Sequence, residues 1–365
     1  MKTVLFAGGG TGGHLMPALA IAQAMVDQDP SVRPYFVGAV RGVEAGVLPA
    51  RPWAHELLPL EPIYRRQWWR NLALPLRLWR TVAQAGRILE REAPVLAVGT
   101  GGYVAGPVLW AAQRRGVPTV LQEQNAYPGV VTRRLASRAR QIHLGFPEAE
   151  RLLHAGPRAL VRFSGNPIQP PPAVRPDRAA AKARLGFRDA PLVLVVGGSQ
   201  GALGINRAVA EAIGTTGSLG GGVQLLWQTG SATHDQFASL RRDGVVRVEA
   251  FLDPIGDAYA AADLVVARAG AMTMAELAAW GLPVILVPLP TAAADHQLAN
   301  ARAAEQAGAA VLIEQRDLTG GRLAEEVRRL LGDSAGLARL RSGMLARARP
   351  LAASEIARDA LGLVA

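Results

Sequence analysis

A glycine-rich stretch near the N-terminus brings together residue types that can bind an anion and move a proton. Residues 6–25 read FAGGGTGGHLMPALAIAQAM, in which two apolar runs flank five glycines, Thr11 and His14. Glycines let the main chain approach an anion closely, and a helix start offers unbonded N–H groups. An imidazole can accept a proton near neutral pH. The stretch predicts an anion-binding turn beside a candidate base, His14; the alternatives are a ligand-free turn and a histidine that only caps or packs within the helix.

The same stretch also fits the pattern of a dinucleotide-binding loop. Gly8, Gly10 and Gly13 have the required spacing, but the pattern also needs an acidic residue at the end of the second strand. The segment YFVGAVRG at 35–42 has no Asp or Glu, and only Arg41 could recognise a 2′-phosphate. No G-K-[S/T] sequence follows the glycines, which argues against a P-loop hydrolase. An NADP oxidoreductase is therefore the weaker alternative.

A second glycine-rich turn occurs in the other half of the chain. LVLVVGGSQGAL at 192–203 repeats the order strand, glycine turn and helix, with Ser199 in the turn. Further on, ARAGAMTMAELAAWG at 267–281 predicts a helix whose first turn, Met272 to Glu276, could receive a diphosphate. Glu276 could accept hydrogen bonds from sugar hydroxyls, or it could only balance the helix dipole.

Three further turns carry polar side chains. Each of them follows an apolar run, and their sequences are GTGGYVAGP at 99–107, LQEQNAYPG at 121–129 and DHQLANA at 295–301. Ligands of open α/β sheets bind at the edge where the carboxyl ends of parallel strands meet. Five side chains of the first two turns should therefore lie near His14, namely Thr100, Tyr103, Glu123, Gln124 and Asn125. Ordinary turns of glycine, proline and asparagine are the alternative.

The positioning elements follow from the alternation of apolar runs and amphipathic stretches, which is typical of parallel α/β sheets. Strands are predicted near 3–7, 33–38, 94–98, 118–122, 140–144 and 160–163, and near 192–196, 223–228, 245–250, 263–267, 284–287 and 310–313. The segment GNPIQPPPAVRPDR at 165–178 has five prolines and predicts an extended linker. The tail 335–365 has a helical pattern. We therefore expect two doubly wound domains, each opening with a glycine-rich turn.

Composition narrows the class of protein. The chain has 365 residues, no cysteine and a formal charge of +11 that is almost entirely due to arginine. The lack of cysteine excludes disulfides, thiolate metal sites and thiol catalysis. The charge favours an anionic partner, namely nucleic acid, a phosphate-bearing substrate or an acidic lipid surface, although codon usage can also enrich arginine. The sequence shows no nucleic-acid-binding motif, no signal peptide and no apolar run of about 20 residues that could span a membrane.

Taken in order, these segments resemble the MurG family of glycosyltransferases. The resemblance covers residues 3 to about 310 and rests on the turns above together with GNPI, FLDPIGDAYAAADLVVARAGAMTMAE and GLPVILVPLP. It implies the α/β GT-B fold, in which two Rossmann-like domains face each other across a cleft. Residues 1–163 would form an acceptor and membrane-facing domain and 164–339 a UDP-N-acetylglucosamine (UDP-GlcNAc) domain, with helices of about 340–365 packing back on the first.

The resemblance also implies site residues. Donor contacts would be Thr11, Gly12, Gly13, Asn125, Gln169, Ser199, Leu252, Ala271, Met272, Thr273, Met274, Ala275, Glu276 and Gln297, whereas Gly10, Thr100, Tyr103 and Glu123 would lie on the acceptor side. One position departs from the family pattern, because the usual arginine of G-N-P-[VI]-R is Gln169 here. Arg162 or Arg268 could supply the missing charge.

The implied reaction is an inverting transfer of N-acetylglucosamine to the 4-hydroxyl of a lipid-linked muramyl-pentapeptide in peptidoglycan synthesis, with His14 as the base. Another GT-B UDP-sugar transferase or an epimerase of that fold is the alternative. We expect no required cofactor and no metal site, although Mg²⁺ could accompany the nucleotide. The D-x-D sequence Asp27–Asp29 lies where the first helix should end, so we interpret it as a solvated turn.

The expected partners are UDP-GlcNAc, the lipid-linked muramyl-pentapeptide, an anionic membrane surface and further cell-wall synthesis proteins, but no nucleic acid. In IYRRQWWRNLALPLRLWR at 63–80, tryptophans and leucines recur at helical spacing beside arginines, which is typical of an interfacial helix. The predicted membrane contacts are Arg66, Trp68, Trp69, Arg70, Leu72, Leu76 and Trp79. A core-facing helix with a basic face is the alternative. We expect a peripheral location on the cytoplasmic face of the cell membrane.

Overall fold

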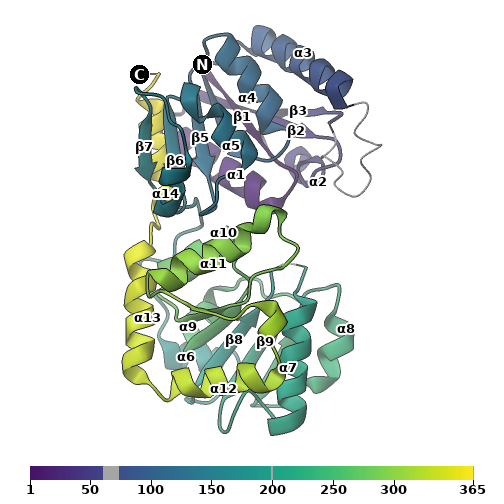
Figure 1. Ribbon diagram of the computed structural model, residues 1–365, viewed down its shortest axis with the longest axis vertical. Helices are drawn as coiled ribbons and strands as arrows, with labels where there is room; N and C mark the ends of the chain where they lie inside the picture. Colours follow the sequence, from purple (N-terminus) through teal and green to yellow (C-terminus); the bar gives the residue numbers. More distant parts are fainter. Residues whose placement is uncertain (61–73, 199, 365) are drawn as a thin grey trace. The chain divides into compact units, whose positions relative to one another are not determined.

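The chain divides into two compact units (Figure 1). The computed structural model describes residues 1–60, 74–198 and 200–364. Unit 1 comprises Met1–Gln169 and Leu351–Ala365, and unit 2 comprises Pro170–Pro350. The division therefore lies within the proline-rich linker, six residues beyond the boundary expected from the sequence. The linker is irregular until a helix begins at Arg178.

Unit 1 is built on a seven-stranded parallel sheet in the order β3-β2-β1-β4-β5-β6-β7. Its strands are β1 (Lys2–Gly8), β2 (Val32–Ala39), β3 (Ala54–Leu58), β4 (Leu96–Gly101), β5 (Thr119–Glu123), β6 (Gln141–Leu144) and β7 (Leu160–Phe163). Its helices are α1 (Gly12–Gln28), α2 (Glu44–Val47), α3 (Leu74–Glu92), α4 (Ala105–Arg114), α5 (Val130–Leu135) and α14 (Ala352–Leu361). Six of these strands were predicted from their apolar runs. The apolar pattern did not predict β3, because this edge strand buries only its last residue well.

The two faces of this sheet are buried by different helices, which explains the continuous apolar runs of its central strands. In β1, Val4 and Phe6 join a core cluster with residues of α1 and α14, whereas Leu5 and Ala7 join a cluster with residues of α3 and α4. Successive side chains of a strand point to opposite faces, so these four residues are buried alternately on the two faces of the sheet.

The C-terminal helix completes unit 1. Helix α14 packs against α1, and Gln141 Nε2 donates to the Asp359 carbonyl oxygen at 2.7 Å. Asp359 also forms an ion pair with Arg162 of β7. The helix that precedes it, α13 (Ser334–Arg347), instead packs against α10 of unit 2, and its Leu340 lies in that unit's core. Of the tail expected to return to the first domain, residues 340–350 therefore stay with unit 2 and only the part after Pro350 returns.

Unit 2 repeats the same architecture with a six-stranded parallel sheet in the order β10-β9-β8-β11-β12-β13. Its strands are β8 (Leu192–Val196), β9 (Gln224–Gln228), β10 (Val246–Glu249), β11 (Leu264–Ala267), β12 (Val284–Leu286) and β13 (Val311–Leu312), all close to their predicted positions. Its helices, besides α13, are α6 (Arg178–Arg184), α7 (Leu203–Thr216), α8 (His234–Phe237), α9 (Gly256–Ala261), α10 (Ala271–Trp280), α11 (His296–Gln306) and α12 (Gly320–Leu331).

Each sheet contains a point where the strand order reverses. In unit 1 the chain moves outward through β2 and β3, then returns to place β4 on the other side of β1. In unit 2, β11 takes the same place beside β8. Ligands of open α/β sheets bind beyond the carboxyl ends of the strands at such a point. Both glycine-rich turns follow the strands that flank it, β1 and β8.

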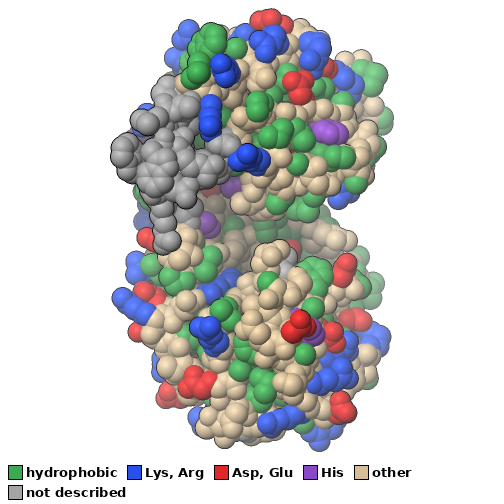
Figure 2. All heavy atoms as spheres, turned by 90° about the vertical axis from the view of Figure 1, so that its right-hand side faces the viewer, with side chains coloured by type: hydrophobic (Ala, Val, Ile, Leu, Met, Phe, Trp, Pro, Cys, Tyr) green, Lys and Arg blue, Asp and Glu red, His purple; other side chains and the backbone are tan. Residues whose placement is uncertain are grey.

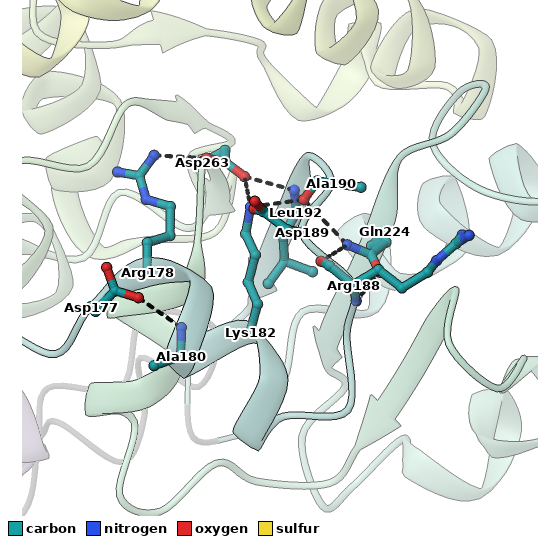
Figure 3. A network of polar contacts seen from close by, with 10 residues as sticks. All are labelled: Asp177, Arg178, Ala180, Lys182, Arg188, Asp189, Ala190, Leu192, Gln224 and Asp263. Carbon is teal, nitrogen blue, oxygen red and sulfur yellow. Dashed lines mark hydrogen bonds and ion pairs between the residues drawn. The ribbon is translucent and has the colours of Figure 1, made fainter.

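The opposite edge of the unit 2 sheet holds a buried ion pair (Figure 3). Lys182 of α6 is almost fully buried, and its Nζ donates to Asp263 Oδ2 at 2.8 Å and to the Ala190 carbonyl oxygen at 2.7 Å. Asp263, just before β11, also accepts from Arg178 at 2.8 Å and from the Leu192 N–H at 2.9 Å. This network fixes α6 against the first residues of β8 and β11.

Replacing Lys182 by methionine should destabilise unit 2 by about 3 kcal/mol, because Asp263 would lose its most buried cation. The loss stays at the lower end of the range for buried pairs because Asp263 keeps Arg178 and the Leu192 N–H. Native-state hydrogen exchange of the β8 and β9 amides measures this free energy for unit 2 alone. The matched control is Arg241→Met, which breaks an exposed pair with Asp243 and should cost less than about 1 kcal/mol. Equal effects of the two variants would contradict the assignment.

Candidate functional site

The first glycine-rich turn connects β1 to α1 and places His14 in the first turn of that helix. Thr11 is the residue before the helix, and its Oγ1 lies 3.1 Å from His14 Nδ1. Thr11, Gly12 and Gly13 are exposed, whereas His14 is half-buried. The threonine hydroxyl therefore holds the imidazole by one ring nitrogen at the carboxyl edge of the sheet.

The last two residues of β4 also contact His14. Thr100 is fully buried, and its Oγ1 donates to the His14 carbonyl oxygen at 2.7 Å. Gly101 has a φ of +97°, and a Cβ at this position would lie 2.8 Å from His14 Cδ2 and 3.2 Å from Nε2. A larger residue at 101 would therefore displace the imidazole. Thr100, expected on the acceptor side, acts here through the backbone of His14.

The turn after β5 is held by the carboxylate of Glu123, which is buried. Its oxygens accept from the Asn125 N–H at 3.1 Å, the Gly129 N–H at 2.9 Å and Thr132 Oγ1 at 2.6 Å. Both oxygens are thus used inside the turn. In this structure Glu123 shapes the loop around the half-buried Asn125 and the start of α5, and its predicted place on the acceptor side stays a prediction.

Gln124 also turns inward. Its side-chain Nε2 donates to the Thr100 main-chain carbonyl oxygen at 2.7 Å, and the main-chain carbonyl oxygen of Gln124 accepts from Asn166 Nδ2 at 3.0 Å. Asn166 in turn accepts from Gln122 Nε2 at 2.9 Å. These buried amides join the end of β4 to β5 and to the segment after β7.

Sequence reasoning missed Glu44, a fully buried carboxylate beneath the first glycine-rich turn. Its Oε2 accepts from the Gly10 N–H at 2.8 Å, and its Oε1 accepts from the Ala39 N–H at 2.8 Å. A Cβ at Gly9 would lie 2.3 Å from Glu44 Oε1, so the close approach requires glycine there. On the other side of the turn, the half-buried Tyr103 packs against Gly10. The Gly10 N–H is therefore already bonded to a carboxylate.

In unit 2 the corresponding edge encloses a cavity of about 660 Å³. Its wall combines the second glycine-rich turn, the start of α7, Gly270 and Thr273 at the start of α10, the turn after β12 and Gln297 of α11. Two predicted donor contacts, Thr273 and Gln297, thus line one cavity. Ser199 lies outside the described residues, but its neighbours Gly198 and Gln200 belong to the wall.

The described charged residues that line this cavity are all basic. Arg207 and Arg268 line it, and none of the described lining residues is acidic. Arg268 is buried, and burial lowers its pKa to about 10. Its guanidinium donates to the carbonyl oxygens of Val287 and Pro288 at 3.0 and 3.1 Å and to Gln315 Oε1 at 2.6 Å. With the N-terminal ends of α7 and α10 also in the wall, the cavity suits an anion.

The remaining predicted residues of α10 lie on different faces of the helix. Ala271 and Met274 are buried, whereas Met272, Ala275 and Glu276 are half-buried. Tyr259 of α9 donates its hydroxyl to Glu276 Oε2 at 2.8 Å. Burial raises the pKa of Glu276, and the Tyr259 hydrogen bond opposes this shift. Within the described residues Glu276 has no cationic partner, so an incoming hydroxyl donor can bond to its other oxygen.

Leu252 lies on a loop fixed by a second residue that the sequence did not reveal. Gln228, the last residue of β9, is buried; its Oε1 accepts from the Leu252 N–H at 3.0 Å, and its Nε2 donates to the Gly198 carbonyl oxygen at 3.2 Å. Gln228 therefore joins the Leu252 loop to the glycine-rich turn.

Other predicted positions are placed as follows. Gln169 is exposed at the end of the first segment of unit 1. Of the two arginines considered as substitutes for it, Arg162 is paired with Asp359 and Arg268 is bonded within the cavity wall.

The D-x-D sequence ends α1, and Asp29 Oδ1 accepts from the Ser31 N–H at 2.9 Å, which confirms a turn. No cluster of three metal-ligating acidic, histidine or cysteine side chains occurs in the described ranges.

Comparison with known proteins gives a consistent result. Two family models match, the glycosyltransferase family 28 N-terminal domain at residues 4–144 and the family 28 C-terminal domain at residues 192–355. A Salinibacter ruber protein named UDP-N-acetylglucosamine--N-acetylmuramyl-(pentapeptide) pyrophosphoryl-undecaprenol N-acetylglucosamine transferase is 43% identical over 362 residues, covering 99% of this chain and 96% of that protein. A Moorella thermoacetica protein of the same name is 40% identical over 356 residues, covering 95% of each chain.

Solved structures lead to the same family as the sequence comparisons. The crystal structure of Acinetobacter baumannii MurG superposes with a TM-score of 0.80 at 26% identity and covers 99% of this chain and all of its own. This chain belongs to the MurG family of glycosyltransferases. The calicheamicin glycosyltransferase CalG4, with a TM-score of 0.69 at 19% identity over 100% of this chain and 99% of its own, shares the fold alone. The MurG-family chain is thus a glycosyltransferase of the GT-B fold, as the sequence predicted.

Replacing Glu44 by glutamine should loosen the first glycine-rich turn of this MurG-family chain, because an amide can accept only through its single oxygen. We expect hydrogen exchange of the Gly10 and Ala39 amides to accelerate at least tenfold, as in local opening. The Leu252 amide of unit 2 is the internal control and should keep its rate. Unchanged exchange at Gly10 would show that Glu44 does not hold the turn.

Proposed function

We propose that this chain transfers N-acetylglucosamine from UDP-GlcNAc to the 4-hydroxyl of a lipid-linked muramyl-pentapeptide, with inversion at C1 of the sugar. The full-length similarity to relatives that carry this activity in their name supports the substrate pair. The observation in this chain that carries the proposal is the cavity at the β8–β11 edge of unit 2, which is lined by two arginines, two helix starts and no described acidic residue.

In this proposal unit 2 binds the donor. The diphosphate lies against the second glycine-rich turn and the start of α10, where N–H groups and the helix dipole favour negative charge. Gln297 accepts the Leu289 N–H through Oε1 at 3.0 Å, so its Nε2 can donate to the sugar. Glu276 accepts from the ribose hydroxyls, and the Leu252 carbonyl oxygen accepts the uracil N3–H.

Unit 1 supplies the base and the acceptor-side turns. With Nδ1–H donating to Thr11 Oγ1, His14 Nε2 carries the lone pair that takes the proton of the acceptor hydroxyl. That oxygen forms a bond to C1 of the sugar while the bond from C1 to the UDP oxygen breaks. The charge that grows on the leaving diphosphate is stabilised by fixed N–H dipoles and arginine. We propose no required cofactor, and Mg²⁺ can accompany the nucleotide.

Replacing His14 by alanine should lower kcat by roughly 10²–10⁴-fold while leaving the Kd for UDP-GlcNAc unchanged, because a general base acts only in the transition state. The measurement is transfer of radiolabelled N-acetylglucosamine to lipid-linked muramyl-pentapeptide, together with calorimetric binding of the donor. His154, an exposed histidine of unit 1, gives the matched control variant His154→Ala.

Two results would contradict this assignment. Turnover of His14→Ala near that of the wild type would remove His14 as the base. Failure of the wild-type chain to form a β-linked product from these substrates would remove the proposed function itself.

We also propose that unit 1 binds an anionic membrane surface on the cytoplasmic side. Five of the predicted membrane contacts lie outside the described residues, namely Arg66, Trp68, Trp69, Arg70 and Leu72. Leu76, Leu78 and Trp79 of α3 are exposed, and so is Trp110 of the adjacent α4, over whose ring the Arg114 guanidinium lies at 5.5 Å from the centroid. Figure 2 shows hydrophobic and basic side chains interspersed on one face of the unit. Apolar anchors beside arginines suit such a surface.

None of the helices in the described ranges is long and apolar enough to cross a bilayer. Contact through side chains on α3 and α4 is the peripheral mode that the proposal requires.

Replacing Leu76 by alanine should weaken binding to vesicles that contain anionic phospholipid about fivefold or more, because a buried leucine side chain loses roughly 1 kcal/mol or more of transfer free energy when truncated. Co-sedimentation with vesicles measures the change. Leu345 of α13 is exposed to a similar extent, 44% against 50% for Leu76, and gives the matched control variant Leu345→Ala. Equal binding of both variants would place the membrane contact elsewhere.

A further inference from the structure

The two arginines of the unit 2 cavity differ in their bonding. The Arg268 guanidinium is bonded to two carbonyl oxygens and to Gln315, so it is part of the wall. Arg207, in the second turn of α7, is exposed, and its side chain forms no hydrogen bond or ion pair with any other described residue. Arg207 nevertheless lines the cavity.

The main chain beneath Arg207 is held firmly. Its neighbour Asn206 is fully buried; Asn206 Nδ2 donates to the Thr229 carbonyl oxygen at 2.8 Å and to Thr233 Oγ1 at 3.0 Å, and Oδ1 accepts from Trp227 Nε1 at 3.0 Å. This anchors the first turns of α7 to the end of β9. The main chain at Arg207 is therefore fixed, and only its long cationic side chain has to reorganise around a ligand.

We propose that the Arg207 guanidinium binds the diphosphate of the sugar nucleotide in this cavity and selects diphosphate-bearing ligands over the nucleoside. This assignment rests on the proposed function and adds a specificity residue to it. A guanidinium donates two parallel hydrogen bonds to phosphate oxygens, and such charge-assisted bonds are the stronger class. The cavity wall offers Arg207 no described carboxylate that would compete with a phosphate.

The hydrogen bonds of Arg268 explain why Arg207, and not Arg268, is proposed to bind the diphosphate. Moving Arg268 toward a ligand would leave the Val287 and Pro288 carbonyl oxygens unsatisfied in a buried position, which costs free energy. Arg207 loses only contacts with water when it turns to the ligand. The helix dipole of α7 acts in the same direction, because its positive end lies in the cavity wall.

The test compares Arg207→Gln with Arg339→Gln by calorimetry and ligand-observed NMR, using UDP-GlcNAc, UDP and uridine as ligands. Arg339 is an exposed arginine of α13 outside the cavity, so both variants remove one surface charge from unit 2. Arg207→Gln should weaken UDP-GlcNAc and UDP on the order of tenfold, the effect of one charge-assisted hydrogen bond. Uridine binding should stay the same, and Arg207→Lys should recover part of the loss.

Salt gives a second readout, since an exposed charge is screened. The difference in UDP-GlcNAc affinity between Arg207→Gln and the wild type should become smaller at high ionic strength. A loss of affinity caused by misfolding would not depend on salt in this way. Glu276→Gln serves as the positive control for the ribose side of the site.

The outcomes separate this inference from the proposed function. If Arg207→Gln binds UDP-GlcNAc as Arg339→Gln does while Glu276→Gln binds it weakly, the Arg207 assignment fails and the donor site stands. If uridine weakens as much as UDP, Arg207 does not act on the phosphates and the assignment again fails. If the wild-type chain binds none of the three ligands, the proposed function fails first.

Discussion

Parallel strand pairing is the constraint on which both candidate sites depend. In a parallel sheet all carboxyl ends lie on one edge, so every turn from strand to helix is formed there. The reversal of strand order beside β1 and beside β8 separates neighbouring turns and opens space at those positions. The glycine-rich turns, His14, the Arg207 and Arg268 pair and Gln297 all lie on these edges. The amino edges carry structural contacts instead, such as Lys182 with Asp263 and Arg33 with Glu92.

The two glycine-rich turns look alike in sequence but have opposite electrostatic surroundings. The turn after β1 has the buried Glu44 carboxylate beneath it, and this carboxylate already accepts the Gly10 N–H. The turn after β8 faces a cavity with two arginines and no described acidic residue. A nucleotide diphosphate is therefore favoured at the second turn, whereas the first turn holds an imidazole and exposed polar groups. This difference supports the proposal that unit 2 binds the donor, independently of the similarity of the two motifs.

Buried polar side chains give both sites their rigidity. Thr100 in unit 1, and Gln228 and Asn206 in unit 2, each bond to main-chain groups that are distant in sequence, whereas Glu123 bonds to the main chain of its own turn. Unpaired polar groups in such positions would be costly, so each of them fixes one arrangement of the turns. The groups proposed to meet a ligand, such as His14, Arg207 and Gln297, can then remain partly exposed without losing their position.

The sequence by itself determined the two domains, most strand positions and the turns that carry the candidate residues, because strands buried on both faces read as continuous apolar runs and glycines mark the turns between them. It did not determine β3, an edge strand whose residues are mostly half-buried or exposed. It also did not reveal Glu44, Gln228 or the bonding of Arg268 and Glu123. Those roles depend on hydrogen bonds between residues that lie far apart along the chain or turn inward, and only the packed tertiary structure decides which buried group finds which partner.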